Sequence, residues 1–106
     1  MRVLLDECLP RKIKNEFVEN QAATVPEMGW AGKKNGELIR LATGEFQAFI
    51  TIDQNLTFQQ NLATSALAVV MFVAPDNRLE TLKPLVPRVE EALRTAQPGD
   101  VIRVGY

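Results

Sequence analysis

The chain has 106 residues, of which 46% are hydrophobic and 24% are charged, and its formal net charge is −1. This length and composition predict one globular domain, 1–106, with no room for a regulatory module. One cysteine and no histidine argue against an internal disulfide, a thiolate–imidazole zinc site and any catalytic triad with a histidine base. No apolar run approaches the roughly 20 residues of a membrane span, and 3–5 is too short for a signal-peptide core, so we expect a cytoplasmic protein.

The first half of the chain alternates short strands with helices. A buried strand is predicted at 3–5, and an amphipathic helix follows over 10–20 because apolar residues recur there at helical spacing. A second strand is predicted at 22–25. A turn-rich loop over 26–32 then leads to a second helix over 35–42, which a Thr-Gly pair ends.

The second half continues the alternation. A third strand is predicted at 48–52, and the long apolar run at 66–73 is typical of a central strand covered on both faces. A helical pattern over 79–96 is interrupted by Pro84 and Pro87, which predicts a kink or two short helices.

The end of the chain completes the predicted fold. Asn77 and Glu80 have the spacing of a capping box at the start of the last helix, and 101–104 is predicted to be an edge strand. Strands that alternate with helices imply right-handed crossovers and a mostly parallel sheet of about five strands. The predicted class is therefore a three-layer, Rossmann-like α/β domain.

Acidic residues directly follow two of the predicted strands. Asp6 and Glu7 follow 3–5, and Asp53 follows 48–52. The carboxyl ends of parallel strands meet at one edge of a sheet, where ligands bind, so these acids are expected to converge. Close carboxylates repel unless a cation or a proton intervenes, and Mg²⁺ prefers such oxygen ligands. The structural alternatives are that Asp6 caps the first helix, that Glu7 is solvated and that Asp53 bonds its own turn amides.

Basic residues gather at the starts of the first two helices, at the edge where the acids are expected. They are Arg11, Lys12, Lys14, Lys33 and Lys34. With a net charge near zero, any contact with nucleic acid must come from such a local cluster. These side chains could hold phosphates beside a metal, and the alternative is a solvated polar face.

Four segments resemble a family of bacterial PIN-like proteins, and the likeness extends over nearly the whole chain. The segments are VLLDECLP at 3–10, MGWAG at 28–32, NGEL at 35–38 and TIDQNL at 51–56. The family is generally assigned to the toxin components of toxin–antitoxin systems, and wider PIN domains are Mg²⁺- or Mn²⁺-dependent ribonucleases. The resemblance thus implies a PIN-like domain with an RNA substrate, a small cognate antitoxin protein as partner and, as in related domains, a homodimer.

The resemblance also assigns residues. Asp6, Glu7 and Asp53 correspond to metal-binding acids. Glu37 is included as a substitute for the acid that Asn35 replaces, and the four form the expected catalytic set, in which a water activated by the metal attacks an RNA phosphodiester. Asn35 and Asn55 stand where many relatives have acids, so we expect them in a supporting shell around the metal ligands.

Two alternative functions remain open on the sequence. The asparagines at 35 and 55 favour a PIN-like fold that has lost catalysis and binds a protein or RNA. A phosphoacceptor receiver domain also resembles the first half of the chain, but it should carry a hydroxyl residue after the fourth strand and a lysine after the fifth. Ala74 and Gly105-Tyr106 occupy those regions here.

Overall fold

The computed structural model describes residues 1–52 and 66–105, apart from the side chain of Asn35. The strands are β1 (Arg2–Leu5), β2 (Gln21–Thr24), β3 (Ala48–Thr51), β4 (Ala68–Val73) and β5 (Val101–Gly105). The helices are the 3₁₀ helices η1 (Arg11–Glu16) and η3 (Lys83–Leu85) and the α-helices α1 (Asn35–Ala42), α3 (Leu79–Leu82) and α4 (Val86–Thr95). All pairings are parallel, in the order β2-β1-β3-β4-β5.

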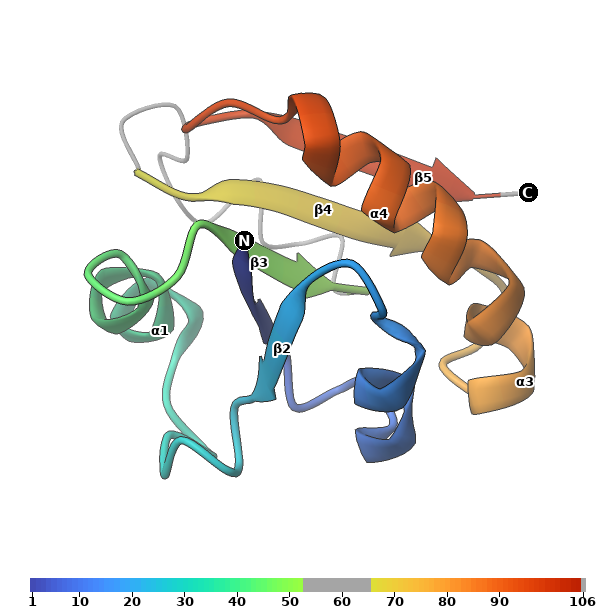
Figure 1. Ribbon diagram of the computed structural model, residues 1–106. Helices are drawn as coiled ribbons and strands as arrows, with labels where there is room; N and C mark the ends of the chain where they lie inside the picture. The colour runs from blue at the N-terminus through green and yellow to red at the C-terminus, as the bar shows by residue number, and fades with distance from the viewer. Residues whose placement is uncertain (53–65, 106) are drawn as a thin grey trace.

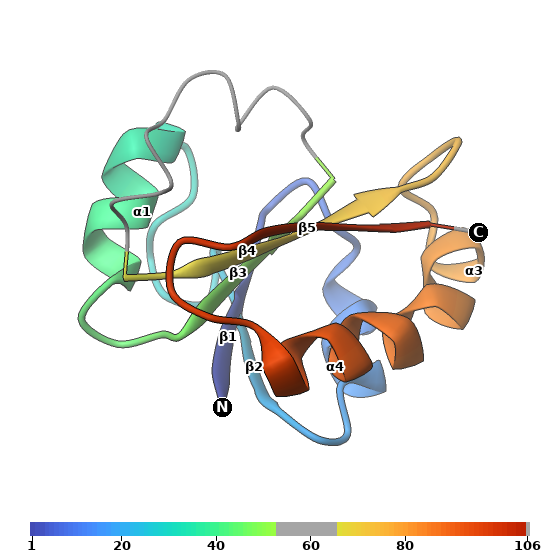
Figure 2. The same cartoon turned by 90° about the horizontal axis from the view of Figure 1, so that it is seen from above.

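Two apolar cores sandwich this sheet, because successive side chains of a strand point to opposite faces. Leu5, Ile50 and Val70 face the side covered by η1, α3 and α4. Leu4 and Phe49 face the side covered by α1. Figure 2 shows α1 on one side of the sheet and α3 and α4 on the other. The predicted three-layer α/β class is therefore confirmed, as is the buried interior strand β4.

The first helix differs from its prediction. It is a 3₁₀ helix that ends at Glu16 rather than an α-helix over 10–20. The backbone N–H groups of Val18 and Glu19 donate to the carboxylate of Glu90 instead of to helical carbonyls. Val18, one of the apolar residues within the predicted helix, is consequently 84% exposed.

The last helical region is broken as the two prolines predict. Pro84 and Pro87 lie in the first turns of η3 and α4, where a missing N–H costs nothing. The capping-box prediction is wrong, because Arg78 is the N-cap of α3. The Asn77 amide instead donates to the carbonyl oxygen of Cys8 at 2.8 Å, and so satisfies an acceptor in the segment after β1.

The connections from β2 to β3 and from β4 to β5 run in the same direction across the sheet. The first passes through α1 and the second through α3 and α4, which cover opposite faces. The two crossovers therefore have opposite hands, and the views place the β4–β5 connection as the left-handed one (Figure 1). Right-handed crossovers predominate in parallel sheets, so the prediction fails for this last connection.

A buried carboxylate fixes α4 on the same face as η1. Glu90 is 2% exposed, and its carboxylate accepts hydrogen bonds from Val18 N at 3.2 Å, Glu19 N at 2.7 Å and Asn20 Nδ2 at 2.9 Å. Arg94, one turn further along α4, forms a two-bond pair with the Glu19 carboxylate. Together these contacts hold the turn before β2 against α4.

We predict that Glu90→Gln lowers the free energy of unfolding by about 2–3 kcal/mol, because a neutral amide accepts fewer hydrogen bonds and its NH₂ group faces backbone donors. Glu91→Gln is the matched control, since Glu91 is the next residue of the same helix and is exposed. It should change the free energy by less than about 0.5 kcal/mol. Urea denaturation measures both, and equal effects would show that the buried carboxylate is not the anchor.

A candidate site at the carboxyl edge of the sheet

The strand order reverses at β1. The chain passes from β1 to β2 on one side, and β3 then pairs with β1 on the other. In open parallel sheets, ligands bind outside the carboxyl ends of the two strands that flank such a reversal. Asp6 follows β1 directly, and Thr51 is the last residue of β3, so both lie at this point.

Asp6 is held rigidly there. The residue is 7% exposed, the Thr51 hydroxyl donates to Oδ2 at 2.7 Å, and the Glu7 backbone N–H donates to Oδ1 at 2.8 Å. Its own N–H donates to the Ile50 carbonyl at 2.9 Å. The first helix has Pro10 as its N-cap and no side-chain cap, so Asp6 is not a helix cap. The Cys8 side chain is a third hydrogen-bond partner of this carboxylate.

Cys8 adds a half-buried thiol to this corner. Its Sγ lies 3.8 Å from the Thr51 Oγ1. Burial raises the pKa of the Cys8 thiol, a hydrogen bond from the Ile52 backbone opposes the rise, and the charge of Asp6 adds to it. Cys8 is therefore a neutral thiol at physiological pH rather than an activated nucleophile.

Glu7 and Glu37 have other partners. The Glu7 carboxylate accepts from Gly32 N at 3.1 Å, and Gly32 has a φ of +83°, which a residue with a Cβ adopts only with strain. Glu7 therefore fixes the loop that leads to α1. Glu37 pairs with Lys33 at 3.0 Å, one turn apart on the helix.

Not all predicted site residues can be placed. Asp53, Asn55 and the side chain of Asn35 lie outside the described residues. Within 1–52 and 66–105, no three acidic or cysteine side chains lie close enough together to hold a metal ion. What the described part brings together at the strand reversal is Asp6 with Thr51 and Cys8.

The five basic residues divide into two groups. Lys14 pairs with Glu27 at 2.9 Å, and Lys33 pairs with Glu37. Arg11, Lys12 and Lys34 are exposed, and their side chains make no hydrogen bond or ion pair with the described part of the chain. Within that part, this second group keeps its full charge available to a ligand.

Sequence reasoning missed Thr51 and Glu27. Thr51 is the last residue of β3, which pairs with β1. The sequence signal that could have identified it is a hydroxyl residue two positions before an acid that follows a strand. Glu27 follows β2 in a turn where it accepts from Thr24 N, while its own N–H donates to the Thr24 hydroxyl. A Thr and a Glu three residues apart are a sign of such a reciprocal pair.

Comparison with known protein families, curated proteins and solved structures finds no match in any of the three. In the described ranges, none of the helices has the length and apolar character needed to span a bilayer. The resemblance to PIN-like proteins remains a prediction, and what the chain binds has to be inferred from its own residues.

We predict that Thr51→Val lowers the free energy of unfolding by about 2 kcal/mol, because it removes a donor from a buried carboxylate without changing the side-chain volume much. Thr95→Val, at an exposed position in the last turn of α4, is the matched control and should be close to neutral. Denaturant midpoints report both. If the two variants have the same denaturant midpoint, the hydroxyl of Thr51 does not hold Asp6.

Proposed function

We propose that this chain is a metal-dependent endoribonuclease that acts as the toxin of a toxin–antitoxin system. The observation that supports it best is the carboxylate of Asp6, which is buried at the strand reversal and oriented by two donors. Burying a carboxylate is costly unless it is hydrogen-bonded or binds a cation, and oriented carboxylate oxygens are ligands that Mg²⁺ prefers.

The donor set fits a hard cation. The chain has no histidine and one cysteine, so the ligands that it offers are mainly oxygen atoms, as Mg²⁺ or Mn²⁺ requires. Asp6 would hold the metal, with Asp53, Glu7 or Glu37 as further ligands. A bound divalent cation supplies Lewis acidity at the scissile phosphate and makes water easier to deprotonate.

The chain's own residues would do the rest. Thr51 keeps the Asp6 carboxylate in one orientation. Arg11, Lys12 and Lys34 stand at the starts of the helices that follow β1 and β2, where they can hold the phosphates of an RNA strand. A nuclease that acts on cellular RNA endangers its own cell, which fits a cytoplasmic protein neutralised by a small antitoxin. The proposal also includes a homodimer, which is supported only by the resemblance of the sequence to PIN-like proteins.

A PIN-like binding module without catalysis is the second candidate. The observation in its favour is that Glu37 is neutralised by Lys33. A receiver domain is less well supported. Its strand order matches, but Ala74 follows β4 and Gly105 ends β5, so the expected hydroxyl and lysine are missing.

We predict that the purified protein cleaves single-stranded RNA in Mg²⁺ and not in EDTA. Asp6→Asn should reduce the rate by at least about a hundredfold, because it removes a charged metal ligand. Asp100→Asn is the matched control, since Asp100 also accepts a backbone N–H in a turn but precedes β5 and so lies at the opposite edge. It should cleave like the original protein.

Two results would count against the enzyme. Cleavage that persists in excess EDTA would remove the metal from the mechanism. Absence of cleavage, together with no rise in melting temperature when Mg²⁺ is added, would favour the binding module, because a cation that binds the folded state must stabilise it.

We also predict that binding of RNA weakens with salt through Lys12 and Lys34. Lys12→Gln combined with Lys34→Gln should reduce the slope of log affinity against log salt by up to about 1.4, because each single-strand phosphate that a lysine neutralises adds about 0.7 to that slope. Arg40→Gln, in the last turn of α1, should leave the slope unchanged. Titrations in EDTA at several salt concentrations measure the slopes, and an unaltered slope in the double variant would make these lysines a solvated face.

A further inference from the structure

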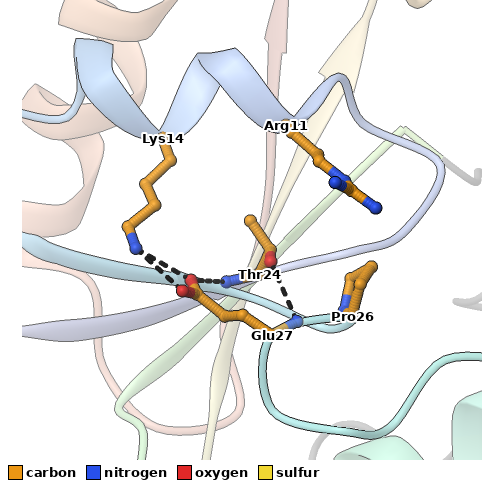
Figure 3. A pocket seen from close by; sticks show the side chains of 5 residues that line it. All are labelled: Arg11, Lys14, Thr24, Pro26 and Glu27. Atoms are coloured by element: carbon orange, nitrogen blue, oxygen red, sulfur yellow. Dashed lines mark hydrogen bonds and ion pairs between the residues drawn. The ribbon is translucent and has the colours of Figure 1, made fainter.

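A second feature of the carboxyl edge is a pocket between η1 and the turn that follows β2. Arg11 and Lys14 line it from the helix, and Thr24, Pro26 and Glu27 line it from the strand end and turn. It encloses about 340 Å³, at the small end of the range for ligand sites. Figure 3 shows the Lys14 and Glu27 side chains meeting across the pocket, with the Arg11 guanidinium extending separately over Pro26.

Glu27 is a fixed, ionised acceptor in this pocket. Its Oε1 accepts from Lys14 Nζ at 3.0 Å and from Thr24 N at 2.6 Å, and its Oε2 accepts from Lys14 Nζ at 2.9 Å. The hydrogen bond from Lys14, and then that from Thr24 N, lower the pKa of the Glu27 carboxyl group. Because Oε2 has one partner in the described part of the chain, it keeps room for another donor.

One positively charged side chain of the pocket has no anionic partner among the described residues. Lys14 and Glu27 neutralise each other, whereas Arg11 makes no hydrogen bond or ion pair with the residues that the structure describes. A simple anion would find Arg11 but would also face the Glu27 carboxylate. A ligand that presents an anionic group to Arg11 and a hydroxyl donor to Glu27 satisfies both.

The pocket adjoins the proposed catalytic corner. Thr24 pairs in register with Leu5, and Val25 N donates to the Leu5 carbonyl at 2.9 Å. Leu5 is the residue before Asp6, so one strand end separates the pocket wall from the buried carboxylate. A polymer that passes Asp6 can therefore place a neighbouring unit in the pocket.

We propose that this pocket binds one nucleotide unit of the RNA strand, with a phosphate on Arg11 and the ribose 2′-hydroxyl donating to Glu27. The proposal rests on the proposed function, because it assumes that the polymer at Asp6 is RNA. Ribose phosphate carries an anion and a hydroxyl donor close together, and DNA lacks the 2′-hydroxyl. The pocket would thus make the chain select RNA over DNA before any bond is cut.

The test uses the full chain in EDTA, where no cleavage interferes, with short single-stranded probes of one sequence as RNA, 2′-O-methyl RNA and DNA. Fluorescence anisotropy should give an RNA affinity roughly three- to tenfold tighter than that of the other two probes, the effect of one charge-assisted hydrogen bond. The methylated probe keeps an RNA-like sugar but has no donor, so it should bind like DNA.

Two variants separate the contacts. Arg11→Gln, at an exposed position, should weaken binding of all three probes by a similar factor, because it removes a phosphate contact. Glu27→Gln should remove most of the preference for RNA. If Glu27→Gln does not fold, as a thermal melt would show, the comparison of probes on the original protein and on Arg11→Gln still decides the matter.

Several outcomes would overturn the inference. Equal affinity of the original protein for the three probes would do so, as would a preference for RNA that survives in folded Glu27→Gln. Arg11-dependent binding of an Asp- and Glu-rich peptide, without binding of any oligonucleotide, would assign the pocket to a protein partner.

Mg²⁺-dependent cleavage by the original protein alongside any of these results would leave the proposed function intact. Selective binding without cleavage would instead contradict catalysis and keep the pocket.

Discussion

Parallel pairing of all five described strands is the constraint on which the rest of this structure depends. It brings every strand's carboxyl end to one edge, so residues that are far apart in the sequence meet there. The reversal of strand order at β1 then decides which of them become neighbours. Thr51 lies beside Asp6 because β3 pairs with β1 in a register that sets Ile50 against Leu5.

The turns at this edge are held by carboxylates in two different ways. Glu7 and Glu27 are exposed, and each binds a backbone N–H at the end of β2 or in the segment that follows it. Asp6 is buried and binds the N–H of its own neighbour. The exposed acids therefore shape the loop, and the buried one offers oxygen atoms of the kind that a hard cation prefers.

Much of the fold could be predicted from the sequence, because short buried strands and helices with one apolar face are local patterns. The strands at 22–25 and 48–52 differ from the structure by a residue at their ends. The early end of η1 and the left hand of the last crossover could not be predicted. The first depends on Glu90, whose partners lie some 70 residues earlier in the chain. The second depends on the face of the sheet against which α4 packs, and no local pattern contains either contact.

The site was predicted in part. Asp6 follows β1 as expected, and its orientation by Thr51 required the register of two strands. Charge alone suggested five cations for phosphate binding, but two of them are neutralised by glutamates. Only the fold brings Glu27 near Lys14, whereas Glu37 lies near Lys33 through the spacing of one helical turn. The pocket beside Arg11 joins a helix to a turn more than ten residues later, which no pattern within either segment indicates.

The anchor on Glu90 also has a consequence for how the protein is made. A ribosome releases the chain from its N-terminus, so residues 18–20 emerge about 70 residues before the carboxylate that binds them. Until α4 has left the ribosome, the backbone N–H groups of Val18 and Glu19 lack the buried acceptor that they bind in the folded protein. The turn therefore gains this support only after α4 has been made, and contacts between residues so far apart in the sequence slow folding.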